Sequence, residues 1–379
     1  MLRIAAIALT SLLLTGCASS TAPGPMPPET ATATPTETAA VSTAPAHILD
    51  LTCPDVMPDD DLALLFGEAS APIAEDLLLT APMSAALRNA GGITCMWGND
   101  MPAVLNGDAD IMDPARETLN ISLLPATTAA RWDEYASVYR QDTAEVAFGD
   151  GSGSACSAEP DYRHCNANIL VGDVWIEFDV VGVSLDESRT EDDLVAFARP
   201  ILERLVDRVA AASVSGAPSP TEVAPRTDCE TILPVDAVKE VLGITEDGVQ
   251  KGQSGEGGGG LSLRQDGATR AGHSTCIVGV FRSDLYWAAS AYLPEGAWAF
   301  EPTAVENGVW DDAEPVAVDG ADSAYQECTI GENGPCIVDM AIGSAWVRVS
   351  LPIDGEVIID SAHRTGVLDL AGLVAANVD

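Results

Sequence analysis

The nine cysteines are the residues of this 379-residue chain with the widest range of possible chemistry. A thiol can be a nucleophile, bind a metal, carry redox equivalents or form a disulfide, and the spacing of cysteines helps to separate these roles. No Cys-x-x-Cys sequence occurs, so the usual spacing of redox and zinc-ribbon sites is missing. Cys17 ends a short apolar run, and the other eight cysteines form two sets of four.

The segment before Cys17 has the pattern of a signal peptide. Residues 1–16 contain one basic residue, Arg3, and then an apolar run that ends at Leu14. The run is too short to span a bilayer, which takes about 20 apolar residues. The sequence Leu14-Thr15-Gly16-Cys17 resembles the lipobox of bacterial lipoproteins. The resemblance implies that Cys17 becomes the lipidated N-terminus and anchors the protein at the extracytoplasmic face of the cell membrane. An ordinary secreted protein or an uncleaved anchor is the alternative.

Two segments rich in Pro, Ser, Thr and Ala divide the rest of the chain. Residues 17–47 contain almost no large apolar side chains, so we expect a lipidated, disordered tether. Residues 213–226 have a similar composition and predict a linker between two domains, 48–212 and 227–379. Two domains also agree with the length, because a single core rarely grows past about 250–300 residues.

The two domains carry the same landmarks at the same offsets. Cys53 precedes Pro58 by five residues and Gly67 by fourteen, and the second half repeats these offsets at Cys229, Pro234 and Gly243. In each half a tryptophan also follows the last cysteine by ten residues: Trp175 after Cys165, and Trp346 after Cys336. These matches predict a tandem duplication.

Each unit reads as helix, strands, helix, three strands and helix. Thr190 and Asp193 form a capping-box-like start to the last helix of the first unit, and apolar residues then recur at steps of three and four. We therefore expect an α+β fold class: two tandem homologous domains, each a largely antiparallel sheet with packed helices.

Four cysteines in each unit allow three pairings, and the sequence alone does not choose among them. Close pairs across a hairpin favour Cys156–Cys165 and Cys328–Cys336, which leaves Cys53–Cys95 and Cys229–Cys276. An even number of cysteines after Cys17 is typical of proteins that fold in an oxidising compartment. Free or metal-bound thiols are the alternative.

The charge of the chain excludes some classes of partner. The formal net charge is −40, from 58 acidic against 18 basic residues, which disfavours binding to nucleic acid and to anionic lipid. We interpret the acidic excess as a solvated surface, with a cation-binding face as the alternative.

No catalytic residue is nominated by the sequence. The four histidines are His47, His164, His273 and His363, and neither His-Glu-x-x-His nor Gly-x-Ser-x-Gly occurs. We therefore expect no metal and no cofactor, although a Ser/His/Asp triad stays open. Asn106 to Asp110 offers oxygens to calcium but lacks the downstream Glu of a calcium loop, so a polar turn is the simpler interpretation. Glu256 to Gly260 reads as a surface loop.

Tryptophans crowd the second unit, at Trp287, Trp298 and Trp310. Aromatic side chains can form platforms for sugars or peptides, but core packing is the more usual role. Trp175 and Trp346, at matching strand positions, are expected in the core.

Two features carry a family resemblance: the spacing from Cys53 to Gly67, repeated from Cys229 to Gly243, and the strand Cys95-Met96-Trp97. The chain resembles actinobacterial lipoproteins of unknown function whose domains are similar to PsbP-like α/β sandwiches. It is also similar to the disulfide-bearing extracellular sensor domains of some mycobacterial kinases. The second unit departs from the pattern, since Cys276-Ile277-Val278 lacks the Trp. The resemblance implies a fold and a location, and no catalytic residues.

The expectation is therefore a non-enzymatic envelope lipoprotein, a binding or scaffold module whose partner is an envelope protein or cell-wall glycan. Two alternatives stay open: an extracytoplasmic hydrolase acting on envelope material, and a carrier of small molecules or lipid. A deep apolar pocket would favour the carrier, and a cleft with paired carboxylates of raised pKa would favour the enzyme.

Overall fold

The computed structural model describes residues 43–67, 71–98, 117–139, 149–159, 162–182, 190–213, 222–226, 228–242, 250–253, 262–279, 287–300, 313–328, 330, 335–351 and 359–378. The signal peptide, Cys17, most of the expected tether and Asn106 to Asp110 lie outside these residues, as do Glu256 to Gly260 and Trp310.

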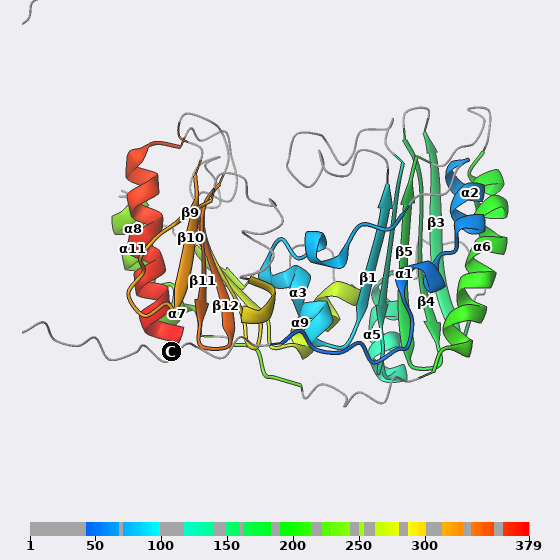
Figure 1. Cartoon of the computed structure of the whole chain (residues 1–379), viewed down its shortest axis with the longest axis horizontal. Helices are drawn as coiled ribbons and strands as arrows, with labels where there is room; N and C mark the ends of the chain where they lie inside the picture. The colour runs from blue at the N-terminus through cyan, green and yellow to red at the C-terminus, as the bar shows by residue number, and fades with distance from the viewer. Residues whose placement is uncertain are drawn as a thin grey trace, which may run out of the picture. The chain divides into compact units, whose positions relative to one another are not determined.

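The first repeat is built on one five-stranded antiparallel sheet in the order β1-β2-β5-β4-β3 (Figure 1). Its strands are β1 (Ile93–Gly98), β2 (Thr118–Leu124), β3 (Gly151–Glu159), β4 (Tyr162–Val171) and β5 (Val174–Val181). Its helices are α1 (Cys53–Val56), α2 (Asp59–Phe66), η1 (Glu75–Leu78), α3 (Pro82–Asn89), α5 (Ala129–Tyr139) and α6 (Glu191–Ala211).

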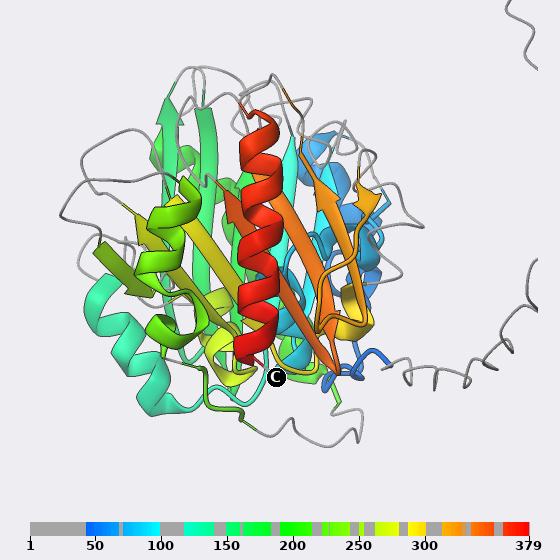
Figure 2. The ribbon, with the colours of Figure 1, turned by 90° about the vertical axis from the view of Figure 1, so that its left-hand side faces the viewer.

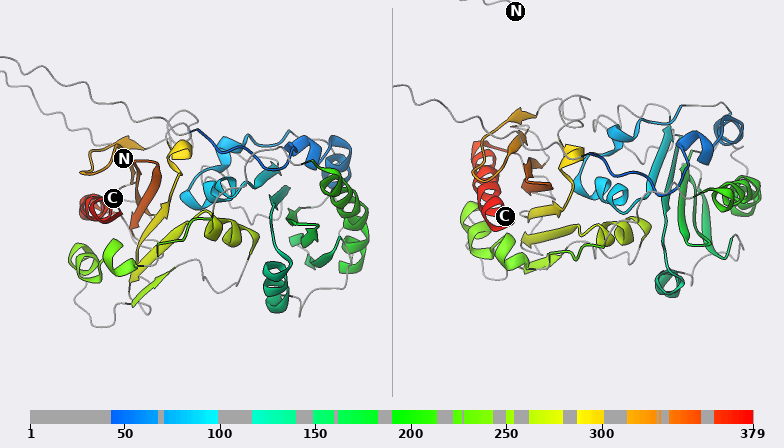
Figure 3. Two further views of the ribbon diagram at one scale, coloured as in Figure 1. Left: turned by 90° about the horizontal axis from the view of Figure 1, so that it is seen from below. Right: turned by 60° about the horizontal axis from the view of Figure 1, so that its bottom comes forward.

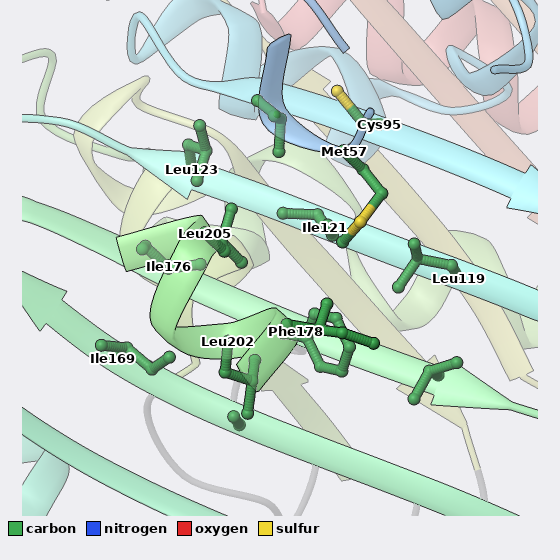
Figure 4. Close-up of a cluster of buried hydrophobic side chains, with 14 of the residues drawn as sticks. Met57, Cys95, Leu119, Ile121, Leu123, Ile169, Ile176, Phe178, Leu202 and Leu205 are labelled. Atoms are coloured by element: carbon green, nitrogen blue, oxygen red, sulfur yellow. The ribbon is translucent and has the colours of Figure 1, made fainter. Parts of the chain in front are cut away.

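The main core of the first repeat lies between α6 and one face of this sheet, which we call the α6 face. Leu202 and Leu205 of α6 point onto Ile121, Ile176 and Phe178 of the strands (Figure 4). The Thr190 hydroxyl accepts a hydrogen bond from the Asp193 amide and caps α6. Alternating apolar residues on the strands and one apolar stripe on the helix account for this packing.

The second repeat has a seven-stranded antiparallel sheet in the order β6-β7-β8-β12-β11-β10-β9. The strands are β6 (Gln250–Gln253), β7 (Ser274–Gly279), β8 (Trp287–Leu293), β9 (Glu314–Pro315), β10 (Ser323–Glu327), β11 (Cys336–Ile342) and β12 (Ala345–Leu351). The helices are α7 (Cys229–Ile232), α8 (Val235–Leu242), α9 (Leu263–Arg270) and α11 (Ser361–Val378). Helix α11 crosses one face of this sheet (Figure 2), with Val367, Leu370 and Val374 buried.

The α+β fold class is confirmed, because each repeat is an antiparallel sheet with packed helices. The cysteine and tryptophan landmarks occur at matching positions in the two repeats. The expected order of elements omitted one helix in each repeat, α3 in the first and α9 in the second. Both are eight residues long and precede the first cysteine-bearing strand. Pro82 at the start of α3 and Ser262, which caps α9, are the local signals that mark them.

Helices α3 and α9 pack against each other, and each also packs on the sheet of the other repeat (Figures 1 and 3). Helix α3 contacts β8 and β12, and α9 contacts β2 and β5. Ala85 and Ala86 of α3 join a buried cluster with Phe300 and Trp346 of the second repeat. Leu263 of α9 joins Leu124 and Trp175 of the first. Each repeat therefore covers part of the second face of the other repeat's sheet.

The hydrogen bonds between the repeats are reciprocal as well. Asn89, at the end of α3, donates its side-chain amide to the carbonyls of Pro294 and Glu295 at 3.0 and 3.1 Å. Arg270, at the end of α9, donates to the carbonyl of Pro125 at 2.8 Å and to that of Ala126. Ala126 and Glu295 both have positive φ angles, 57° and 53°. The turns after Leu124-Pro125 and Leu293-Pro294 therefore hold the C-terminal ends of α9 and α3, respectively, in equivalent ways. We call α3 and α9 the exchanged helices, because each packs on the sheet of the other repeat.

One buried carboxylate also links the repeats. Asp266 of α9 is 1% exposed, and its Oδ1 accepts from Arg131 Nε of α5 at 2.5 Å. Its Oδ2 accepts from Arg270 Nη2 at 2.8 Å. Two cations, which together donate three hydrogen bonds, compensate the burial of this charge, which would otherwise be costly.

The disulfides are Cys53–Cys95 and Cys156–Cys165 in the first repeat, and Cys229–Cys276 and Cys328–Cys336 in the second. These are the pairs that the sequence favours. Two of them tie the first short helix of a repeat to its sheet, and the other two close short loops.

Within the described part of the chain, no helix combines the length and the apolar character needed to cross a bilayer.

We predict that residues 48–212 produced alone do not form a stable domain. In this fragment Leu124 and Trp175 lose the cover that Leu263 supplies. Leu79, Ala85 and Ala86 lose their contacts with Phe300 and Trp346, and the combined cost is roughly 5 kcal/mol, which is comparable with the whole stability of many domains. Thermal unfolding monitored by circular dichroism, together with ANS fluorescence, would show this against the 43–379 protein as control. A cooperative transition in the fragment at an unchanged Tm, without ANS binding, would contradict the reciprocal cover.

Candidate binding site on the first sheet

The face of the first sheet opposite the α6 face is largely polar. We call it the polar face and define it by Asn120, Ser122, Asn166, Asn168, Glu177 and Asp179. The strand register places Ser122 and Asn168 on either side of Glu177, and Asn120 and Asn166 on either side of Asp179. On β1, Thr94 lies opposite Ser122, and Met96 lies opposite Asn120. Because side chains alternate between faces along a strand, these residues all share one surface.

Three oxygens on this face are buried without a hydrogen-bond partner: Asn120 Oδ1, Ser122 Oγ and Glu177 Oε2. Ser122 as a whole is 1% exposed. A buried polar group left unsatisfied costs about 1–3 kcal/mol, and native structures contain few of them. Three on neighbouring residues therefore need an explanation beyond packing.

The second sheet differs at most of the equivalent positions. Its register puts Ala289 where the first sheet has Asn120, and Ala291 where it has Ser122. Asp339 and Arg348 replace Asn168 and Glu177 and form a salt bridge at 2.8 Å. The Arg348 Nη2 also donates to the Thr80 carbonyl at 2.7 Å. The second sheet thus shows that this fold does not require the unsatisfied polar groups.

The environment of Glu177 disfavours its charged form. Burial raises the pKa of Glu177; the charge of Arg264 partly offsets this effect, and the charge of Asp179 adds to it. Arg264 belongs to α9, so the second repeat supplies a cation whose charge acts on this carboxylate. The other buried acid of this kind, Asp339, also has a pKa raised by burial, but Arg348 and Trp346 hydrogen bond to it directly.

A cavity of about 190 Å³ adjoins the polar face. Thr94 and Met96 line it from β1, Met83 and Leu87 line it from α3, and Arg264 lines it from α9. Thr94 and Met96 are the direct cross-strand neighbours of Ser122 and Asn120, so the cavity lies next to the polar face, although Asn120, Ser122 and Glu177 do not line it. The lining combines apolar side chains with the charged side chains of Glu75, Arg88 and Arg264, a mixture that is typical of a small-molecule site.

A second arginine of the cavity, Arg88, is already engaged. Its Nη1 donates to Glu75 Oε2 at 2.8 Å and its Nε donates to the Pro45 carbonyl at 2.6 Å. Burial and the charge of Arg88 lower the pKa of the adjacent His47 to about 4, so this imidazole is neutral at pH 7. This cluster closes one wall of the cavity.

His164 lies on β4 and contacts the polar face at its far end. His164 Nε2 and Asp179 Oδ2 are 2.7 Å apart. His273, by contrast, lies just before β7, and its partial burial lowers its pKa to about 4. His363 pairs with Asp360 at the start of α11. The four histidines are therefore dispersed over the structure.

The residues singled out in the sequence contribute little to this site. The eight disulfide cysteines hold the fold and do not line the cavity. Trp175 and Trp346 are fully buried, as expected, but they pack under the exchanged helices and not in the main cores. Trp298 donates to Asn89 Oδ1 at 2.9 Å and packs at the junction of the repeats. Within the described residues, no group of three His, Cys, Asp or Glu side chains is placed to hold a metal ion.

The polar face was missed in the sequence, although a signal was present. Asn120 and Ser122 alternate with apolar residues in β2, and Glu177 and Asp179 do so in β5. Such alternation is normally interpreted as a solvent-exposed face. Alignment of the two repeats would have shown Ala289 and Ala291 at two of these positions.

No family model, no curated protein and no solved structure matches this chain.

We predict that Glu177→Gln stabilises the protein at pH 7. The folded pKa of Glu177 lies above the ordinary 4.5, so its ionisation costs stability as the pH rises above the unfolded value. The gain in Tm should therefore be present at pH 7 and vanish near pH 4, where the wild-type side chain keeps its proton in both states. Glu203→Gln, at an exposed position of α6, is the matched control and should leave Tm unchanged at both pH values. Destabilisation by Glu177→Gln at pH 7 would show that the carboxylate serves the fold.

Proposed function

We propose that this protein is a lipid-anchored envelope protein that binds a small polar molecule at the polar face of its first repeat, without chemical turnover. The observation that carries the proposal is the group of three unsatisfied oxygens, on Asn120, Ser122 and Glu177, beside a cavity. The second repeat has no equivalent group at the matching strand positions.

The cost of these groups supports binding over a purely structural role. Alanine at two of the three positions is compatible with the same sheet, because the second repeat has Ala289 and Ala291 there. A sequence shaped for stability alone would therefore not keep Asn120 and Ser122. Binding sites commonly retain polar groups that destabilise the unbound protein.

The location is proposed from the N-terminal sequence and from the disulfides. The lipobox-like Leu14 to Cys17 implies a lipid at Cys17, and the tether that follows would hold the folded repeats away from the membrane. Disulfides persist in oxidising compartments outside the cytoplasm, which agrees with export. In this arrangement an envelope protein or a cell-wall glycan is the neighbouring partner, and the resemblance to actinobacterial lipoproteins points the same way.

The second candidate function is an extracytoplasmic hydrolase. The His164–Asp179 pair favours it, because a carboxylate orients an imidazole in this way in hydrolytic triads. The raised pKa of Glu177 next to Asp179 is a further feature of acid–base sites. A carrier of lipid has less support, since the cavity is small and partly polar.

We predict that wild-type protein gains thermal stability from at least one member of a library of amino acids, amines, carboxylates, sugars and nucleosides. The double variant Asn120→Ala/Ser122→Ala, which copies the second repeat, should have a higher Tm without ligand and should lose the response. Differential scanning fluorimetry checks both outcomes. Absence of any ligand response in the wild type, with no gain of Tm in the variant, would contradict a binding role. Release of a product from the bound molecule would favour the hydrolase.

We predict that Cys17→Ala abolishes membrane attachment. The thioether can form only on the Cys17 thiol, so labelling with a radioactive fatty acid should mark the wild-type protein and not the variant. Fractionation should then find the variant in the medium or as an uncleaved precursor. Unlabelled wild-type protein in the cell interior would contradict the proposed location.

A further inference from the structure

We infer that a groove on the second repeat binds an amphipathic helix of a partner protein, with aliphatic side chains on one side of that helix and Lys or Arg beside them. The groove lies between α8 and α11, which pack side by side (Figure 2). It shares no residue with the polar face, so the partner protein would bind in addition to the small molecule proposed above.

The groove is long and is apolar in most of its lining. Its volume is about 590 Å³, and its lining residues run from Ala362 to Leu373 on α11 and from Ala237 to Val241 on α8. At a rise of 1.5 Å per residue, the lined part of α11 is about 16 Å long, which is about three helical turns. A groove of this length matches a helix that lies along it, which is a common mode of peptide recognition.

The floor of the groove is set by a close approach of the two helices. A Cβ atom added to Gly366 would lie 2.6 Å from Cγ1 of Val241, so glycine is needed at this position for the observed packing. Leu370 is buried beside it. Val241 and Leu373 are only half-buried, so they offer apolar surface to the side chains of a partner helix.

The groove is specific to the second repeat. Helix α2 corresponds to α8, because Asp61 follows Cys53 by eight residues and Ala237 follows Cys229 by eight. Helix α6 corresponds to α11, because their buried residues recur with the same spacing, from Ala198 to Val209 and from Val367 to Val378. With this correspondence, Arg204 of the first repeat matches Leu373 of the second.

An ion pair joins the two helices of the first repeat at these positions. Arg204 donates to Asp61 Oδ1 through Nε at 2.8 Å and through Nη2 at 2.5 Å. The second repeat has Ala237 and Leu373 instead, and both line the groove. The replacement of a charged pair by a small and an aliphatic side chain therefore leaves apolar surface between α8 and α11.

The charges beside the groove select a basic partner. Glu240 and Asp369 line it from the two helices and are exposed, and among the described lining residues there is no Lys, Arg or His. The matching residues of the first repeat are Leu64 and Pro200, so these acids are not a general feature of the fold. A carboxylate on each wall attracts Lys or Arg of a partner and repels an acidic one, including a second copy of this chain with its net charge of −40.

The test uses two fluorescein-labelled peptides of about 18 residues, or five helical turns. Both carry Leu along one face, and the other positions are Lys in one peptide and Glu in the other. By fluorescence anisotropy with the full-length exported protein, we expect the Lys peptide to bind at least about tenfold more tightly than the Glu peptide. Ala237→Asp/Leu373→Arg, which copies the Asp61–Arg204 pair and keeps the net charge, should weaken binding of the Lys peptide by at least about tenfold.

A second pair of variants separates the groove from the overall charge of the protein. Glu240→Gln/Asp369→Asn changes exposed side chains and should weaken binding of the Lys peptide by at least about threefold. Glu203→Gln/Asp207→Asn removes two exposed acids from α6 and is the matched control, which should change the affinity by less than about twofold. Equal losses in the two variants would show that the peptide responds only to net charge and would overturn the groove.

Photo-crosslinking in cells that export the protein tests the natural occupant. Replacement of Leu373 by p-benzoylphenylalanine should capture a protein through a segment that is amphipathic and rich in Lys or Arg, as identified by mass spectrometry. The same replacement at the exposed Arg199 of α6 should not capture it. A crosslink to lipid, to a glycan or to a second copy of this chain, or no crosslink at all, would overturn the partner. Wild-type affinity in Ala237→Asp/Leu373→Arg, or no binding of the Lys peptide, would overturn the groove.

Discussion

A β-sheet has two faces, and the long last helix of each repeat covers only one of them. Helix α6 covers one face of the first sheet and α11 covers one face of the second, which leaves Trp175 and Trp346 on the opposite faces. Helices α3 and α9 complete the cover of these opposite faces, since each packs on the sheet of the other repeat, and α5 of the first repeat also packs on Trp175. The junction between the repeats depends on this mutual cover, and so does the position of every residue at the proposed site.

The exchange also explains why the site is composite. The polar face belongs to the first repeat, while Arg264 comes from α9 of the second. The two junction surfaces occupy equivalent positions on the two sheets but differ in their side chains. The equivalent surface of the second repeat has the small side chains of Ala289 and Ala291. Its charged residues, Asp339 and Arg348, are partners in a salt bridge. In the first repeat the polar groups remain without partners, which costs stability and leaves hydrogen-bonding capacity for a ligand.

Disulfides stabilise each repeat, and noncovalent contacts join the two repeats. The four disulfides lie within repeats and reduce the conformational freedom of the unfolded chain. Contacts between the repeats are instead made by side chains that bond to turn carbonyls, by packed helices and by the Asp266 carboxylate between Arg131 and Arg270. Disulfides therefore stabilise the individual repeats. The junction between the repeats is instead stabilised by buried apolar surface and by polar contacts between residues of the two repeats.

The sequence by itself determined the features that depend on local spacing and on covalent chemistry. Cysteine offsets predicted two α+β repeats and favoured the observed disulfides, and apolar steps of three and four predicted α6 and α11. Only the tertiary structure decided that α3 and α9 each pack on the sheet of the other repeat, and that the polar groups of Glu177 and Ser122 are buried without partners next to a cavity that Arg264 lines. The reason is physical: periodicity records which side of an element is apolar, but whether a polar side meets water, another repeat or a ligand depends on contacts between residues far apart in the chain.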